Sequence, residues 1–177
     1  RAQAQKAIEV MGPAFGSFAA VLAQSDEDKA RLESLGAKDV LVTGSVKFDI
    51  VPDASQMAAA KAWLTVLSRP VVLLASTRDG EEAAFLESFK KHPALLAETL
   101  VVVVPRHPER FERVVELFES AGLKTIRRST LSTAEDLPAD IQIVVGDSMG
   151  EMSFYCGLAS MTVMGGSFGP FGSQNVV

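Results

Sequence analysis

Hydrophobic residues follow two different spacings along the chain. Within residues 108–122, Phe111, Val114 and Phe118 recur at three- and four-residue intervals, which places them on one face of a helix. The run Leu100–Val104, by contrast, is apolar at every position. A strand without polar alternation is covered on both faces, as in a parallel sheet between layers of helices.

The alternation of these two patterns predicts the fold class. Strands are expected at residues 19–24, 39–45, 70–76, 100–104, 124–128, 141–146 and 161–166. Helices are expected at residues 25–37, 53–67, 79–92, 108–122 and 149–159, with weak helicity before the first strand and a mobile polar loop at 129–140. Strands that alternate with helices predict an α/β fold, a Rossmann-like parallel sheet with helices on both faces.

Composition narrows the classes of function. The 177 residues carry a net charge of -5 without a concentrated basic run, so we expect no nucleic-acid partner. The single cysteine cannot form an internal disulfide, and no apolar run approaches the roughly 18 residues of a membrane span. Two histidines are too few for a histidine-rich metal site, and we expect neither a metal nor another cofactor. Because the chain starts at an arginine, we expect a piece of a longer protein.

Four of the expected strands run directly into polar or glycine-rich loops. These loops are residues 76–82, 105–110, 146–151 and 165–172. In a parallel sheet they all lie at the carboxyl edge, where open α/β sheets bind ligands. The pattern therefore predicts a binding site at this edge.

The chemistry of these loops favours an anionic ligand. Helix N-termini offer free N–H groups, and glycines allow the backbone to approach a ligand closely. Arg78 and Arg106 can hold a phosphate or carboxylate with two hydrogen bonds each. The remaining candidates are the hydroxyl donors Ser76, Thr77 and Ser167, and groups suited to sugar hydroxyls or a base edge, Asp147, Glu151 and Asn175.

Most of these residues also have a purely structural interpretation. Arg106 or Arg110 could pair with a neighbouring glutamate on the surface, where such pairs contribute little. His107, which precedes a proline, could cap the following helix, and Asp147 could cap the next one. The other structural interpretations are a solvated Lys47, a tight turn at Gly165–Gly166, and helix-dipole contacts for Glu81, Glu82 and Glu151.

Taken in order, five segments resemble one known family. They are "VLAQSDEDKARLESLGAKDVLVTGSVKFD", "ASTRDGEE", "VPRHPERF", "VVGDSMGEM" and "MGGSFGPFGSQN", and they extend from Val21 to near the end of the chain. Their order and spacing are similar to those of the 3-deoxy-D-manno-octulosonic acid (Kdo) transferases of lipopolysaccharide biosynthesis.

The resemblance implies a GT-B glycosyltransferase, with two Rossmann-like domains and the active site between them. Residues 1–24 would be a tail or linker from the N-terminal domain, and residues 25–177 the C-terminal, donor-binding domain, truncated at its end. Similar proteins transfer Kdo from CMP-Kdo to a lipid A precursor, with inversion, at the cytoplasmic face of the bacterial inner membrane. Their general base is a carboxylate of the N-terminal domain, so no catalytic residue and no transfer by this chain alone are expected. The single phosphate of CMP-Kdo also leaves little need for a metal.

The resemblance further implies a set of donor-binding residues. In this sequence they are Arg106 and His107 facing the donor, Gly146, Asp147, Met149, Gly150 and Glu151 on the nucleotide side, Gly165, Gly166, Ser167 and Asn175 around the CMP moiety, and Ser76, Thr77 and Lys47 near the cleft.

The sequence departs from the family pattern at two places. Arg78-Asp79 stands where the family commonly has His-Glu, and Ser173-Gln174-Asn175 stands for Gly-His-Asn. The glutamate that usually follows lies beyond Val177, so we expect one ribose-binding partner to be missing. Two other functions fit the same pattern: a sugar-nucleotide epimerase of similar architecture, which would prefer UDP-sugars, and a non-catalytic nucleotide- or sugar-binding module.

Overall fold

The computed structural model describes residues 8–45, 49 and 51–168, and contacts within it divide the chain into two compact units that meet in sequence at residues 50 and 51. The family resemblance instead implied a division after residue 24. The difference arises because a strand on each side of that position belongs to the same small sheet.

The first unit holds α2 (Ile8–Gly16), β1 (Val21–Ala23), α3 (Asp26–Ser34) and β2 (Val40–Val42). Strands β1 and β2 pair in parallel, and Ala23, Ala37 and Val40 form a small buried cluster. The Ser25 side chain caps α3, accepting a hydrogen bond from the Asp28 N–H at 3.2 Å. This pairing groups residues 25–42 with the preceding segment.

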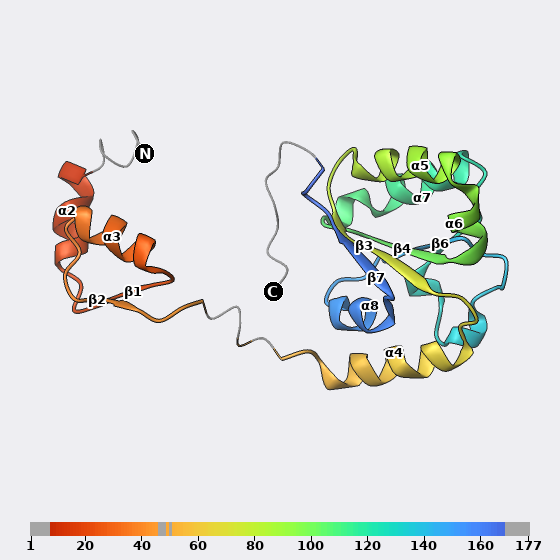
Figure 1. Cartoon of the computed structure of the whole chain (residues 1–177), viewed down its shortest axis with the longest axis horizontal. Coiled ribbons are helices and arrows are strands. Elements are labelled where there is room, and N and C mark those ends of the chain that lie inside the picture. The colour runs from red at the N-terminus through yellow and green to blue at the C-terminus, as the bar shows by residue number, and fades with distance from the viewer. Residues whose placement is uncertain (1–7, 46–48, 50, 169–177) are drawn as a thin grey trace. The chain divides into compact units, whose positions relative to one another are not determined.

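The second unit is a five-stranded parallel sheet with the order β5-β6-β4-β3-β7 (Figure 1). Its strands are β3 (Val71–Thr77), β4 (Leu100–Pro105), β5 (Thr125–Arg127), β6 (Ile143–Val145) and β7 (Met161–Met164). Its helices are α4 (Ala54–Val66), α5 (Glu81–Lys91), α6 (Pro93–Glu98), α7 (Phe111–Ser120) and α8 (Met152–Leu158), with 3-10 turns η2 (Pro108–Arg110), η3 (Arg128–Thr130) and η4 (Ala134–Asp136). Among the described helices, none has the length and apolar character needed to cross a bilayer.

The aliphatic strands are buried because helices cover both faces of the sheet (Figure 1). In β4, Val101 and Val103 belong to the cluster under α5, α6 and α7, whereas Val102 and Val104 belong to the cluster under α4 and α8. Successive side chains of one strand thus enter opposite cores, which explains why no position alternates with a polar residue. The predicted fold class is confirmed.

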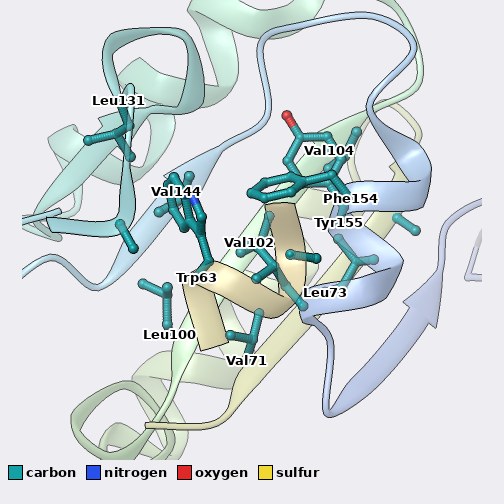
Figure 2. Close-up of a cluster of buried hydrophobic side chains, with 14 of the residues drawn as sticks. Trp63, Val71, Leu73, Leu100, Val102, Val104, Leu131, Val144, Phe154 and Tyr155 are labelled. Atoms are coloured by element: carbon teal, nitrogen blue, oxygen red, sulfur yellow. The ribbon is translucent and has the colours of Figure 1, made fainter. Parts of the chain in front are cut away.

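Close helix packing fixes one face of the sheet. Ala60 of α4 is fully buried, and a Cβ at Gly157 of α8 would lie 2.8 Å from the Ala60 Cβ. Next to this contact, the rings of Trp63 and Phe154 meet edge to face with centroids 5.2 Å apart. Figure 2 shows these two side chains, with Tyr155, lying over the valines and leucines of the strands.

The segment 129–140, predicted as a mobile polar loop, packs against the sheet instead. Leu131 and Ala134 are buried in the cluster under α4 and α8. The Asp136 carboxylate accepts the N–H groups of Ser132 and Thr133 at 3.0 and 2.8 Å, and η4 has a capping box. Two apolar side chains in a polar stretch are enough to anchor it. Helix α6 was not predicted by the sequence pattern.

We expect Ala60→Leu to lower the free energy of unfolding by about 1–3 kcal/mol, because the larger side chain has no space between α4 and α8. Ala58→Leu is the matched control, since Ala58 is on the exposed side of the same helix. Urea unfolding of both variants measures the difference. Equal stability of the two variants would contradict the packing described.

Candidate functional site

The four predicted loops meet at the carboxyl edge of the sheet. Ala75 in β3 is aligned with Val104 on one side and Met164 on the other, and Val103 is aligned with Val145. The strands are parallel and in register, so their following loops are neighbours. The strand order changes direction at β3, since β4 pairs with one side of β3 and β7 pairs with the other.

A pocket of about 70 Å³ opens at this edge. Five of the residues predicted from sequence line it: Ser76, Arg106, Met149, Gly150 and Glu151. The other lining residues are Val104, Pro105, Ser148, Met152 and Tyr155. Three of the four loops therefore contribute to a single concave surface.

Ser76 reaches the pocket through an irregularity in β3. It has a positive φ of 53°, and the pairing of β3 with β4 shifts register between Ala75 and Thr77. Ser76 is thus an extra residue in the strand, in a conformation that costs energy for any residue with a Cβ. Beyond it the ladder resumes, and the Thr77 carbonyl accepts the Arg106 N–H at 2.9 Å.

The side chains of Arg106 and His107 are both exposed. Arg106 is among the residues that line the pocket, and its backbone N–H is hydrogen-bonded to β3. His107 precedes η2, but its side chain makes no capping hydrogen bond, so the capping interpretation is not supported. Ser167 is exposed as well, and Lys47 and Asn175 lie outside the described residues.

Glu151 is the centre of a hydrogen-bond network within the pocket. One carboxylate oxygen accepts from Arg128 at 3.1 Å, and the other accepts from the hydroxyls of Ser148 and Tyr155, the latter at 3.3 Å. Burial raises the pKa of the Tyr155 phenol well above its ordinary value, so the phenol remains a neutral donor. The carboxylate is therefore fixed in place before any ligand arrives.

Arg128 was not predicted from the sequence. Its guanidinium carbon lies 5.1 Å from the Trp63 ring centroid and 4.7 Å from that of Phe154, while one of its N–H groups donates to the Leu131 carbonyl at 2.6 Å. Arg128 follows β5, whose carboxyl end lies at the same edge as the other loops. This position after a strand could have marked Arg128 as a candidate site residue. The expected strand was short, however, and it led into a polar stretch.

Asp147 is not among the residues that line the pocket. Its carboxylate accepts the Ser129 N–H at 2.8 Å and the Ser129 hydroxyl at 2.6 Å, and it lies 3.9 Å from Arg127. The residue preceding α8 is Glu151, so Asp147 is not the cap of that helix either. Its contacts join the end of β6 to η3.

Thr77 is fully buried and does not line the pocket. Its hydroxyl donates to the carboxylate of Glu82, which also accepts from Arg110 at 2.6 Å. Arg110 donates in addition to the Thr77 carbonyl at 2.9 Å. Arg110 thus pairs with a buried glutamate of the neighbouring loop and not with the adjacent glutamates that the sequence suggested.

The glycines of the site are required for close packing. A Cβ at Gly146 would lie 2.8 Å from the Tyr155 ring and 2.9 Å from Val104. A Cβ at Gly165 would lie 2.6 Å from the Thr77 Cα. Gly166 has a φ of 83°, and its N–H donates to the Glu81 carboxylate.

The comparisons with known proteins identify the family. A family model described as 3-deoxy-D-manno-octulosonic-acid transferase (kdotransferase) matches residues 1–50. The Kdo transferase of Bordetella pertussis is 42% identical over 160 residues, which are 89% of this chain and 37% of the relative, and that of Haemophilus influenzae is 35% identical over 88% of this chain and 36% of the relative. The resemblance to the Kdo transferase family is confirmed. The chain spans little more than a third of the length of these relatives.

A solved structure is also similar to this chain. The C-terminal CMP-Kdo binding domain of WaaA from Acinetobacter baumannii matches with a TM-score of 0.62 and 34% identity, over 71% of this chain and 65% of that chain. The family model that matches residues 1–50 ends where the two compact units divide. The matched family model thus covers the first unit, whereas the candidate site is in the second.

We expect Arg110→Ala to lower the free energy of unfolding by about 3–5 kcal/mol, because it leaves the buried Glu82 carboxylate without a cation. Arg113→Ala is the control, since the exposed Arg113 contacts only the exposed Asp79 among the described ion pairs. Chemical denaturation compares the two variants. A loss no larger than that of the control would show that the pair is not important for stability.

Tyr155 is the only tyrosine in the 177 residues, so phenolate absorbance reports this residue alone. Its pKa is raised by burial in the folded protein, and this contribution to stability is present below the ordinary pKa of 10.0 and is lost as the pH rises beyond it. We expect the phenolate band to appear only when the protein unfolds in alkali, and at the ordinary pKa in urea. A reversible titration at the ordinary pKa in the folded state would refute the buried position.

Proposed function

We propose that this chain is the donor-binding part of a glycosyltransferase that transfers Kdo from CMP-Kdo to a lipid A precursor, with inversion. The observation that carries the proposal is the pocket at the carboxyl edge, where Arg106 and the loop Ser148–Glu151 lie together. The solved relative named as a CMP-Kdo binding domain supports the same conclusion.

The size and charge of the pocket favour one anionic group of the donor. A volume of about 70 Å³ accommodates a phosphate or a carboxylate but not a sugar nucleotide, so most of the donor would lie on the surface outside. Arg106 is an exposed residue that lines the pocket, so its positive charge is available to the donor. Arg128 pairs with Glu151, which reduces the repulsion that this carboxylate would exert on an anion.

The proposed reaction assigns this chain a supporting role in catalysis. The acceptor hydroxyl oxygen forms a bond to the anomeric carbon of Kdo while the bond from that carbon to the phosphate oxygen breaks. CMP leaves with the electron pair, and the hydroxyl proton goes to a carboxylate of the preceding domain. Positive charge at Arg106 would stabilise the departing CMP.

The acceptor, the membrane and the absence of a metal belong to the same proposal. Because the proposed acceptor is a lipid A precursor, we propose that the whole protein acts at the cytoplasmic face of the bacterial inner membrane. The donor has one phosphate where diphosphate sugars have two, so we propose that no divalent cation is needed. CMP titrations with and without a chelator test this part directly.

We expect Arg106→Ala to weaken CMP binding by about 1.5–3 kcal/mol, because a charge-assisted hydrogen bond is lost. Arg113→Ala removes the same charge from the exposed surface of α7 and serves as the control. Isothermal titration calorimetry with CMP measures both.

The same titration separates the alternative functions. Preference for CMP and CMP-Kdo over UDP-sugars supports the proposal, whereas preference for uridine nucleotides supports an epimerase. If Arg106→Ala binds CMP as tightly as the wild-type chain, Arg106 is a surface residue that does not bind the donor. The chain by itself should not transfer Kdo to a lipid A precursor, and turnover in that assay would contradict the proposed division of roles.

A further inference from the structure

Glu81, the first residue of α5, has its carboxylate buried against two loops. It is 4% exposed, and it accepts the N–H of Arg78 at 2.8 Å from the loop after β3. It also accepts the N–H of Gly166 at 2.8 and 2.9 Å and that of Phe168 at 3.2 Å from the loop after β7. One side chain thus joins the ends of two neighbouring strands.

These hydrogen bonds give the glycine-rich loop a structural role. The sequence suggested that Gly165 and Gly166 lie around the ligand, yet the N–H of Gly166 already donates to both oxygens of the Glu81 carboxylate. A buried carboxylate depends on such donors, because water cannot replace them. A ligand phosphate could use this N–H only by displacing Glu81.

Close contacts add to the hydrogen bonds. A Cβ at Gly165 would clash with the Ser76 carbonyl and would lie 2.8 Å from a Glu81 oxygen. The turn therefore packs directly against the end of β3. The Phe168 ring meets Phe85 of α5 edge to face, with centroids 5.4 Å apart. The turn Gly165–Phe168 is thereby held by α5 and in contact with Ser76, which lines the pocket.

We propose that Glu81 is a positioning residue for the donor site, an inference that rests on the proposed function. It holds the Gly165–Phe168 turn against Ser76 and so fixes that side of the pocket, without contacting the donor itself. The charge is essential to this role. Glutamine would place an NH₂ group opposite backbone N–H donors, and aspartate would be one methylene too short to reach both loops.

The experiment measures amide hydrogen exchange and CMP affinity for the wild-type chain, Glu81→Gln and Glu87→Gln. In Glu81→Gln we expect the Gly166 and Phe168 amides to exchange about tenfold faster or more, with Val102 in β4 unchanged, and CMP affinity to fall about tenfold. Glu87→Gln makes the same change in charge on the exposed face of α5, and it should alter neither quantity.

A second variant covers the case in which Glu81→Gln does not fold. Gly165→Ala keeps the charge of Glu81 but pushes the turn away from Ser76 and the Glu81 carboxylate, and it should produce the same two effects. If the Gly166 and Phe168 amides of Glu81→Gln exchange as slowly as in the wild-type chain, the proposal is wrong. It is also wrong if these amides exchange faster but the affinity for CMP does not change. If the wild-type chain does not bind CMP, the proposed function itself fails, and the exchange pattern still shows whether Glu81 holds the turn.

Discussion

The carboxyl edge of the sheet depends on two adjacent buried glutamates, Glu81 and Glu82, which are 4% and 1% exposed. A carboxylate in such a position must be supplied with hydrogen-bond donors or with a cation. Glu81 takes backbone N–H groups from two loops, and Glu82 takes the Thr77 hydroxyl and Arg110. The first turn of α5 therefore determines where three loops lie.

The outline of the fold was predictable from the sequence, because uninterrupted aliphatic strands occur only where both faces of a sheet are covered. The convergence of the loops at one edge followed from parallel pairing alone. The side-chain partners were not predictable in the same way. Glu82 and Arg110 are separated by 28 residues, and their contact depends on β3 and β4 being neighbours.

Two of the sequence interpretations differ from the structure for a related reason. Asp147 is close in sequence to residues that line the pocket, but its carboxylate is bound to Ser129, which follows the neighbouring strand β5. The segment that contains Ser129 reads as polar, although Leu131 and Ala134 anchor it. The polar composition of a loop does not show where the loop packs, because one or two buried side chains are enough to determine its position.

The strand order also has a consequence for how the chain is made. Strand β3 pairs on one side with β7, which follows β3, β4, β5 and β6 in sequence. During synthesis on the ribosome, β3 through β6 emerge well before residues 161–164, so one long edge of an almost wholly apolar strand stays without a hydrogen-bonding partner. Until β7 has emerged, this edge of β3 is open to pairing with strands of other chains.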